Sequence, residues 1–373
     1  MNVLITGSDG FVGKNLVVHL RQRGELKLIC IEKSNSDGEL ADAIAQSDFI
    51  FHLAAVNRTA DAAEFTVGNR DLTVKLAQLV SATGRKVPIV VSSSIQAERD
   101  NPYGQSKLGA EEALLSRTAS LPGAVHIFRL QNLFGKWCRP NYNSVVATFC
   151  HNISHDLPIC IHDPASPISL VYIDDVVDAF TRILDAHLAG VTPAGGPYRT
   201  VEPVYQSTVG EIANSVQGFH DKRKKCEIAN VGTGFIRALY ATYLSYLEPA
   251  DFAYGISKHE DPRGEFAEVL KTRDSGQFSY FTAHPGITRG GHYHHTKNEK
   301  FLVVRGRARF GFRQILTGET FQLETSGTNP QVVDTVPGWS HDITNVGDEE
   351  LIVMLWANEV FDPQKPDTIK FKV

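Results

Sequence analysis

The chain has 373 residues, which is longer than one typical compact domain, so we expect two or three folded units. An apolar fraction of 42% with 21% charged residues is typical of a folded protein and excludes a disordered or collagen-like chain. The net charge of −5 excludes an overall basic field that would attract nucleic acid or an anionic membrane.

The five cysteines are scattered, and none of them forms a CxxC pair. This pattern argues against a disulfide framework or a cysteine zinc site and favours a reducing cytoplasm. Asp9 and Lys14 interrupt the apolar run that a signal peptide would need, and no apolar stretch approaches the roughly 20 residues that cross a bilayer. We therefore expect a cytoplasmic protein with neither a membrane nor a nucleic-acid partner.

The first half of the chain alternates short β-rich runs with longer helical periods. Residues 49–53 and 89–91 are almost wholly apolar, as strands are when helices cover both faces of a parallel sheet. Residues 72–80 and 108–115 carry apolar positions at three-to-four spacing, which indicates helices. The alternation predicts an α/β fold with a doubly wound parallel sheet for residues 1–247.

A spaced glycine triplet, Gly7, Gly10 and Gly13, follows the first apolar run and precedes a helical stretch. Glycines at these positions allow a tight turn and let the backbone approach a pyrophosphate at a helix N-terminus. A plain strand-to-helix turn would use the same residues. The position after a first strand favours a dinucleotide site.

Tyr103 and Lys107 are four residues apart, so on a helix they share one face. A free phenol titrates near ~10, and we expect the ammonium to stabilise the phenolate and lower its pKa toward neutral pH. Residues 92–94 are three serines at the end of the 89–91 strand, where ligands bind in open α/β sheets. Separately, each feature has an ordinary structural interpretation, as a surface pair or a helix cap. Together they favour a hydride-transfer enzyme.

These residues resemble the extended short-chain dehydrogenase/reductases, which have a Rossmann fold. The motifs that carry the resemblance are Thr6-Gly7-x-x-Gly10-Phe11-x-Gly13, His52-Leu53-Ala54-Ala55, Ser92-Ser93-Ser94, Tyr103-x-x-x-Lys107 and Tyr172-Ile173-Asp174-Asp175-Val176. By this resemblance Ser94 is the catalytic serine, with Ser93 as the alternative. Tyr103 is the acid/base, and Lys107 tunes it and holds the nicotinamide ribose.

The same resemblance implies the residues that line the cofactor, namely Gly7, Asp9, Gly10, Phe11, Gly13, His52, Leu53 and Ala54. Asn132 and Lys136 are candidate contacts to a UDP-sugar, with a structural loop as the alternative. We interpret the pair Asp174-Asp175 as a helix N-cap.

The choice between NAD and NADP depends on the end of the second strand, residues 28–31. Glu32 would bond a ribose hydroxyl and favour NAD, whereas Lys33 with Ser34 could accept a 2′-phosphate. The local chemistry is ambiguous. We predict NADPH bound with the help of Lys33, and NAD stays open.

After residue 247 the texture changes to short strand-like runs separated by Gly, Pro and Asn turns. Residues 278–281, 299–304, 308–312 and 352–355 are examples, and many short strands indicate a β-sandwich or barrel for residues 248–373.

His292 and His294 are two residues apart, so on a strand they face the same side, and Glu299 and His341 follow. A polar strand face is the plainer interpretation of the histidine pair. Imidazoles with a carboxylate suit Zn, Fe, Ni or Mn, and the residue types do not choose among these ions.

This half resembles the cupin superfamily, with motifs at residues 291–306 and 337–345, which implies an all-β cupin barrel. By that resemblance His292, His294, Glu299 and His341 bind a divalent metal, which we predict to be zinc and which is either catalytic or structural. His295 is expected to point away. Candidates for a base near this site are Tyr293, His284 and Lys300.

The two halves together resemble the bifunctional capsule and lipopolysaccharide enzymes of the CapF type. The further matching stretches include residues 52–58, 132–138 and 356–359. The resemblance implies that the cupin inverts carbon 3 of UDP-2-acetamido-2,6-dideoxy-β-L-arabino-hex-4-ulose. The reductase then reduces the carbon 4 ketone with NADPH. The product would be UDP-2-acetamido-2,6-dideoxy-L-talose, on the route to UDP-N-acetyl-L-fucosamine.

Two alternatives stay open. One is another nucleotide-sugar epimerase or dehydratase whose cupin acts on a different keto-sugar. The other is a non-enzymatic Rossmann–cupin redox sensor, against which the intact Ser94, Tyr103 and Lys107 argue. A symmetric homodimer is the expected assembly on general grounds.

Overall fold

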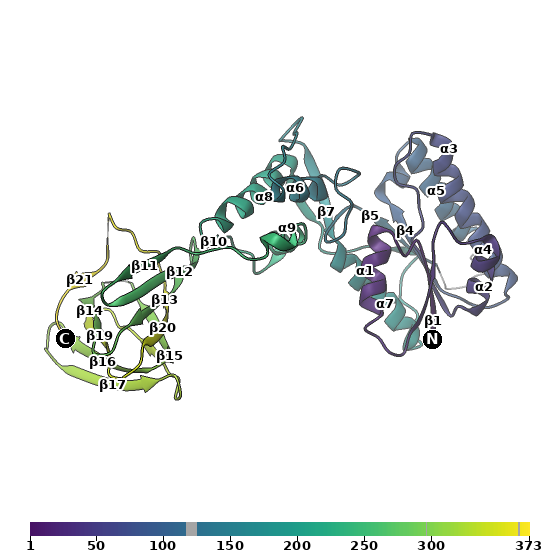
Figure 1. Cartoon of the computed structure of the whole chain (residues 1–373). Helices are drawn as coiled ribbons and strands as arrows, with labels where there is room; N and C mark the ends of the chain where they lie inside the picture. Colours follow the sequence, from purple (N-terminus) through teal and green to yellow (C-terminus); the bar gives the residue numbers. More distant parts are fainter. Residues whose placement is uncertain (117–124, 296, 365) are drawn as a thin grey trace. The chain divides into compact units, whose positions relative to one another are not determined.

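A computed structural model describes residues 1–116, 125–295, 297–364 and 366–373. The chain forms two compact units (Figure 1). The first contains Met1–Gln217 and Thr233–Leu247, and the second contains Gly218–Gly232 and Glu248–Val373. Thr296, in the first predicted cupin motif, lies outside the described residues. No helix in the described part of the chain is long and apolar enough to cross a membrane.

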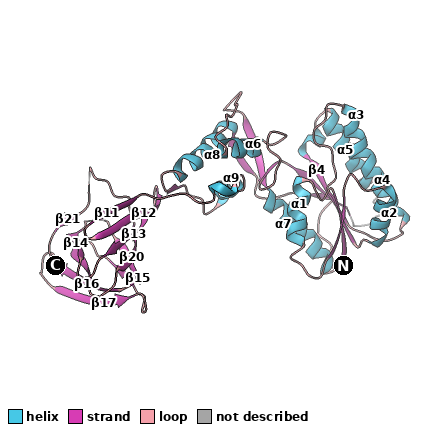
Figure 2. Cartoon of the chain, in the orientation of Figure 1, coloured by secondary structure: helices cyan, strands magenta, loops and turns pink. Residues whose placement is uncertain are grey.

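A six-stranded parallel sheet forms the centre of the first unit, in the order β2-β1-β3-β4-β5-β8. Its strands are β1 (Asn2–Thr6), β2 (Lys27–Ile31), β3 (Phe49–His52), β4 (Ile89–Ser94), β5 (Val125–Leu130) and β8 (Tyr198–Arg199). The helices between them are α1 (Phe11–Leu20), α2 (Asp37–Gln46), α3 (Ala62–Phe65), α4 (Leu72–Ala82), α5 (Pro102–Leu115) and α7 (Ile173–Leu188). The predicted doubly wound α/β fold is confirmed (Figure 2).

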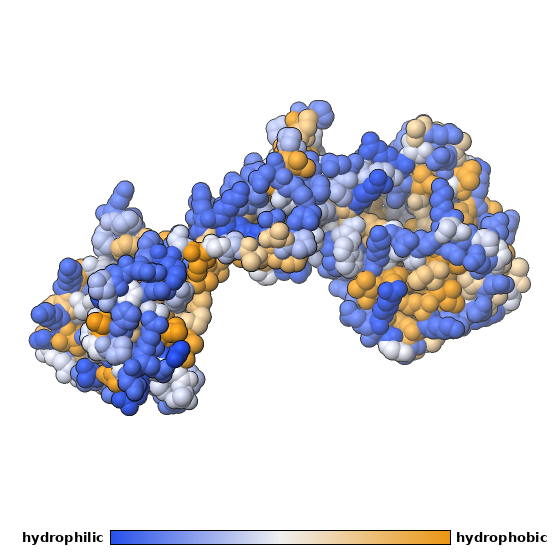
Figure 3. Space-filling view, in the orientation of Figure 1, coloured by the Kyte–Doolittle hydropathy of each residue, from blue (hydrophilic) through white to orange (hydrophobic). Residues whose placement is uncertain are grey.

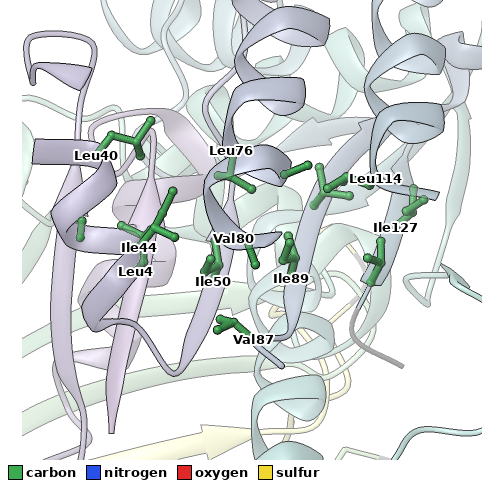
Figure 4. Close-up of a cluster of buried hydrophobic side chains, with 14 residues drawn as sticks. Leu4, Leu40, Ile44, Ile50, Leu76, Val80, Val87, Ile89, Leu114 and Ile127 are labelled. Atoms are coloured by element: carbon green, nitrogen blue, oxygen red, sulfur yellow. The ribbon is translucent and has the colours of Figure 1, made fainter. Parts of the chain in front are cut away.

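Both faces of this sheet are buried, as the apolar runs predicted. On one face, strand residues from β1, β3, β4 and β5 pack against α2, α4 and α5 (Figure 4). The buried side chains include Leu4, Ile50, Ile89, Ile127, Ile44, Val80 and Leu114. On the other face, the ring of Phe180 in α7 lies 6.0 Å from Phe51 and 4.8 Å from Phe128. The sheet is therefore a rigid layer that fixes the positions of its strand ends.

The strand order reverses at β1, because β2 lies on one side of it and β3 on the other. In open α/β sheets such a reversal leaves a crevice at the carboxyl ends of the two diverging strands. Here the crevice lies beyond Thr6 and His52.

A second, three-stranded sheet completes the first unit, in the order β6-β7-β9. Its strands are β6 (Asn132–Phe134), β7 (Pro167–Tyr172) and β9 (Tyr205–Thr208), and the unit also contains helices α6 (Val145–Ser154) and α9 (Gly234–Leu244). Helix α8 (Val209–Arg223) begins in the first unit and ends in the second. The N-cap prediction for Asp174-Asp175 is wrong. Because β7 continues directly into α7, Tyr172 is the N-cap and the two aspartates lie in the first helical turn.

The second unit is rich in β-structure, as predicted. One sheet has the order β10-β12-β13-β20-β15-β18, with β11 paired to β12, and the other has the order β17-β16-β19-β14-β21. The first contains β10 (Glu227–Ile228), β11 (Lys258–Asp261), β12 (Gly264–Thr272), β13 (Gln277–Ala283), β15 (Glu299–Arg305), β18 (Val332–Asp334) and β20 (Leu351–Ala357). The second contains β14 (Thr288–Tyr293), β16 (Arg307–Gln314), β17 (Thr320–Ser326), β19 (Trp339–Asn345) and β21 (Ile369–Lys370).

The two β-sheets share one core, in which buried side chains from both meet. Phe281 and Phe301 come from one sheet, and Phe310 and Ile343 come from the other. Hydrophilic residues cover most of the face of each unit shown in Figure 3, with apolar residues scattered among them.

Candidate active site and metal centre

The glycine turn between β1 and α1 lies against the end of β3. Gly7 has φ of +69°, and a Cβ atom there would lie 2.7 Å from the backbone of Ala54. A Cβ atom on Gly13 would lie 2.2 Å from the carbonyl oxygen of Gly7. Only glycine fits at either position, because backbone atoms rather than flexible side chains stand in the way. Within the described ranges, no side chain caps the N-terminus of α1 at Gly10, as pyrophosphate binding there requires.

His52 is buried at the carboxyl end of β3, next to the crevice. Its Nδ1 lies 2.8 Å from Thr6 Oγ1 and its Nε2 lies 2.9 Å from Thr73 Oγ1, so both ring nitrogens have partners within the protein. Burial, with a smaller contribution from the positive charge of Lys107, lowers the pKa of His52 to about 3. The His52 side chain is therefore neutral and has a structural role. Leu53 and Ala54, which follow it beside the glycine turn, are half-buried.

Glu32, at the end of β2, lies against the same turn. One of its carboxylate oxygens accepts hydrogen bonds from the Ser8 hydroxyl and from the Asp9 backbone N–H, the latter at 2.7 Å. An acid here is positioned to meet a ribose hydroxyl, while Lys33 is exposed next to it.

Tyr103 and Lys107 lie on α5, one turn apart, with the Lys107 Nζ atom 5.9 Å from the centre of the Tyr103 ring. Helix α5 begins at Pro102, and its start is fixed by Asn101, which accepts a hydrogen bond from the Gly104 N–H at 2.8 Å. The Tyr103 hydroxyl donates to Asn57 Oδ1 at 3.1 Å.

Ser94 lies within hydrogen-bond reach of Tyr103, and this bond acts to lower the pKa of the phenol. The three predicted catalytic residues, Ser94, Tyr103 and Lys107, are thus brought together where β4 meets α5.

The two candidate serines face opposite sides of β4. The Ser93 hydroxyl is buried and donates to Glu111, which also accepts from Arg129 at 3.0 and 2.6 Å. The Ser94 hydroxyl oxygen instead accepts from the Gln96 N–H at 3.1 Å, on the same side as Tyr103. The geometry favours Ser94 over Ser93.

Asn132 is the first residue of β6, and Lys136 lies two residues beyond the end of this strand. The exposed Asn132 donates to the Ser169 carbonyl oxygen at 3.1 Å, and Lys136 forms an ion pair with Asp174. The Lys136 carbonyl oxygen accepts from Asn15 of α1 at 3.2 Å. This loop is therefore tied to the helix that follows the glycine turn.

In the second unit, His292, His294, Glu299 and His341 converge, with one candidate ligand atom from each within 4.8 Å of the others. His292 comes from β14 and His341 from β19, where the two residues are paired across the sheet. The Nε2 atoms of His294 and His341 lie 3.2 and 3.4 Å from Glu299 Oε2. All four predicted metal ligands are brought together, and His295 lies outside the cluster with an exposed side chain.

The protonation of this cluster fits a metal ion. Burial opposes ionisation of Glu299, but hydrogen bonds to His294 and His341 and the charge of Lys297 outweigh it and hold the Glu299 pKa well below its usual range. Burial, with the neighbouring imidazoles, lowers the pKa of His292 to about 4. Metal ligands must be deprotonated, and the lowered pKa values give Glu299 and His292 that state at neutral pH.

His341 directs one ring nitrogen into the cluster. Its Nε2 atom lies 3.4 Å from Glu299 Oε2, and among the described residues its buried Nδ1 atom has no hydrogen-bond partner. Three imidazoles and one carboxylate are a donor set that zinc and similar ions accept.

Comparison with known proteins places this pair of sites in a family. Residues 3–195 match the NAD dependent epimerase/dehydratase family, and residues 259–369 match the polysaccharide biosynthesis C-terminal domain. A relative from Pseudomonas aeruginosa, UDP-2-acetamido-2,6-beta-L-arabino-hexul-4-ose reductase, is 54% identical over 368 residues, 99% of this chain and 98% of its own. The chain belongs to the CapF-type family of epimerase/reductases.

Solved structures agree with the CapF-type assignment. The capsular polysaccharide assembling protein CapF from Staphylococcus aureus is 40% identical and has a TM-score of 0.91, with 100% of each chain covered. UDP-glucose 4-epimerase from Thermus thermophilus, solved with NAD, has a TM-score of 0.52 at 18% identity and covers 66% of this chain and 99% of that chain. The latter likeness concerns the fold alone. As a CapF-type protein the chain is an enzyme, which contradicts the redox-sensor alternative.

The expected effect of Lys107 on the phenol is wrong in this structure of the CapF-type chain. Burial raises the pKa of Tyr103, with only the Ser94 hydrogen bond opposing it. The Lys107 ammonium instead donates to the Ser92 carbonyl oxygen at 3.0 Å. Burial lowers the pKa of Lys107 itself to about 8, against the charge of Glu111.

For three residues of the CapF-type sites, the sequence led to no predicted role. Asn57 accepts the hydrogen bond of Tyr103, and Asn69 bonds both backbone groups of Val56 next to it. Lys297 is buried, with its Nζ atom 3.0 Å from Glu299 Oε1. An asparagine inside an apolar helical period and a lysine between two ligands are the signals that were available.

None of the three candidate bases belongs to the metal cluster. His284 and Lys300 are exposed and lie beside Glu350 and Asp334. Tyr293, the last residue of β14, lies between the ligands His292 and His294 in the chain, and its ring contacts His295 and Phe371.

Proposed function

We propose that the protein catalyses two consecutive steps on a UDP-linked 4-keto-6-deoxy amino sugar. The β-rich unit would invert carbon 3 of UDP-2-acetamido-2,6-dideoxy-β-L-arabino-hex-4-ulose, and the parallel-sheet unit would reduce the carbon 4 ketone with NADPH. The product would be UDP-2-acetamido-2,6-dideoxy-L-talose, on the route to UDP-N-acetyl-L-fucosamine for capsule or lipopolysaccharide. We further propose that it works in the cytoplasm as a homodimer.

The name of the Pseudomonas relative supports this substrate, because that protein is a reductase of a UDP-linked hexul-4-ose and is 54% identical across nearly the whole chain. The observation that carries the reductase step is the grouping of Ser94, Tyr103 and Lys107 at the end of β4. Bound dihydronicotinamide would supply the hydride to carbon 4.

Tyr103 then gives its proton to the oxygen of carbon 4, while the Ser94 hydroxyl donates a hydrogen bond to the same oxygen. The proton moves from the phenol to the new alcohol, which leaves a phenolate that solvent reprotonates. Lys107, whose Nζ atom lies 5.9 Å from the centre of the Tyr103 ring, is proposed to hold the nicotinamide ribose beside it. Glu32 and Lys33 are the residues proposed to hold the adenosine ribose, with Asn132 and Lys136 on the sugar nucleotide.

The epimerase step is proposed for the His292–His341 cluster. A proton α to a ketone is acidic enough for a side-chain base to remove, and its return on the opposite face inverts the carbon. A divalent cation, for which we propose zinc, would stabilise the enolate oxygen or hold the site together. Reduction of the ketone afterwards removes the acidity and fixes the new configuration.

The test combines purified protein, NADPH and the UDP-4-ketosugar in deuterium oxide. We expect loss of NADPH absorbance and deuterium uptake at carbon 3. If NADPH is not oxidised, the reductase assignment is refuted and another nucleotide-sugar epimerase or dehydratase becomes the better explanation. His341→Ala tests whether the metal takes part in the epimerisation. Deuterium uptake that persists in this variant would show that the epimerisation does not depend on the metal.

A further inference from the structure

The last residues of the chain form a strap along the strand that carries the metal cluster. We define this C-terminal strap as residues 367–373. Its strand β21 pairs with β14, so that Lys370 lies opposite His292. The Phe371 N–H donates to the Gly291 carbonyl oxygen at 2.9 Å, and the Phe371 carbonyl oxygen accepts from the Ser340 hydroxyl. The strap is therefore bonded to both strands that deliver histidines to the cluster.

Asp367, the first residue of the strap, accepts hydrogen bonds from the segment between β14 and β15. Its backbone carbonyl oxygen accepts a hydrogen bond from His294 Nδ1. Its carboxylate accepts from the His295 N–H at 2.9 Å and from the Lys297 N–H at 2.9 Å. His294 lies one residue beyond the end of β14, and Glu299 is the first residue of β15. One aspartate thus holds the connection between two of the four metal ligands.

The bond to the His294 ring has a chemical consequence. A carbonyl oxygen only accepts hydrogen bonds, so Nδ1 carries a proton and Nε2 is the ring nitrogen left to bind a metal ion. That Nε2 atom is the one that lies 3.2 Å from Glu299 Oε2, inside the cluster. Partners on the outer nitrogen of a ligating histidine fix its tautomer and ring direction, and their loss typically weakens metal binding by about 10–100-fold.

We propose that Asp367 is a positioning residue for the metal centre, so that metal affinity depends on the C-terminal strap. The inference rests on the proposed metal site. Because the strap follows the β14–β15 connection by about seventy residues in the chain, the cluster reaches its binding geometry only when the end of the chain has docked.

The experiment measures zinc affinity of the full-length protein, stripped of metal, by competition with a chromophoric chelator. Asp367→Ala removes the carboxylate that holds the His295 and Lys297 N–H groups but keeps the carbonyl bond to His294, so we expect the zinc dissociation constant to rise by about tenfold, the lower end of the range for losing such a partner. Asp367→Asn keeps one accepting oxygen, so its zinc dissociation constant should lie between those of the parent and of Asp367→Ala. Asp362→Asn is the matched control, because Asp362 is an exposed aspartate just ahead of the strap that accepts from the Gln364 N–H.

A chain that ends at residue 366 loses the carbonyl bond to His294 as well, so its affinity should fall further than that of Asp367→Ala. Cobalt(II) absorption of each variant reports the ligand geometry independently of activity. The thermal midpoint without metal shows whether a variant is folded, and comparison is restricted to those that are.

Equal zinc affinity and equal cobalt spectra in the parent, Asp367→Ala and Asp362→Asn would overturn the role of Asp367. A loss of the same size in Asp362→Asn would also overturn it, because the effect would then not be specific to the contacts of Asp367. A parent protein that binds no zinc would instead refute the proposed metal site itself, which distinguishes the two failures.

Discussion

Separate alanine substitutions of Ser93 and Ser94 should have different effects. Ser93→Ala should mainly lower the stability of the first unit, and Ser94→Ala should mainly lower the rate of ketone reduction. The side chains are adjacent in sequence but lie on opposite faces of β4. Ser93→Ala removes the hydroxyl that donates to the buried Glu111. Ser94→Ala removes the hydroxyl that lies beside Tyr103.

The loss of stability expected for Ser93→Ala depends on the hydrogen bonds that Glu111 retains. Its side chain is only 1% exposed, and it still accepts from Arg129 at 3.0 and 2.6 Å and from the Tyr198 hydroxyl at 3.2 Å. The carboxylate therefore loses one of several hydrogen bonds and is not left unpaired, which costs about 1–2 kcal/mol. For a unit of this size each kcal/mol lowers the melting temperature by roughly 2–4 °C, so we expect a decrease of about 2–8 °C.

The effect of Ser94→Ala should appear in the rate. Losing one donor to a developing oxyanion typically lowers kcat by about 10²–10³-fold, or roughly 3–4 kcal/mol of activation free energy. The variant also loses the acceptor for the Gln96 N–H, which costs about 1 kcal/mol of stability.

Two assays on the same preparations check this pair. Thermal unfolding measures the first effect, and NADPH oxidation with saturating UDP-4-ketosugar measures the second. Ser93→Ala should lower the melting temperature and keep kcat within about twofold of the parent, since Ser93 faces away from Tyr103. The reasoning is refuted if Ser93→Ala abolishes ketone reduction while Ser94→Ala retains it.

Three further predictions follow from the same geometry. Tyr103→Phe should lower ketone reduction by about 10²-fold or more without changing deuterium uptake at carbon 3, and equal loss of both would contradict the division of labour. His52 has its pKa lowered to about 3, below an unfolded value near 6.5. The unfolded chain therefore takes up the proton first, so the stability from neutral His52 is complete above about pH 6.5 and is lost as the pH falls toward 3. Urea unfolding of the parent and His52→Gln checks this, and parallel pH profiles would count against it. Gly13→Ala should abolish NADPH binding measured by calorimetry, because its Cβ would meet the Gly7 carbonyl oxygen at 2.2 Å, whereas Gly24→Ala has nothing within 4 Å and should bind normally.

The elements that sequence reasoning predicted well depend on short-range periodicity. Tyr103 and Lys107 meet because four residues make about one helical turn, and His292 and His294 share a side because strand side chains alternate. The doubly wound sheet follows from apolar runs that alternate with amphipathic helices. Each of these relations is set by neighbours within a few positions of the chain.

The parts that could not be predicted depend on contacts between distant residues. Asn57 meets the Tyr103 hydroxyl across 46 positions, and Asp367 meets the His294 ring across 73. The pKa of Tyr103 went in the opposite direction from the expectation because burial, which tertiary packing determines, outweighs the hydrogen bond from Ser94. Spacing alone contains no information about how deeply a side chain lies.

The excursion of residues 218–232 into the second unit limits how the two activities can be dissected. Strand β10 within this excursion pairs with β12 at Lys271 and Thr272, so a fragment that starts at residue 248 would expose an unpaired sheet edge. Splitting the protein into a working reductase and a working epimerase would therefore need cuts on both sides of residues 233–247. Co-expression of two halves divided at one peptide bond should leave the C-terminal piece with β12 unpaired at Lys271 and Thr272, while β11 still pairs with its other end.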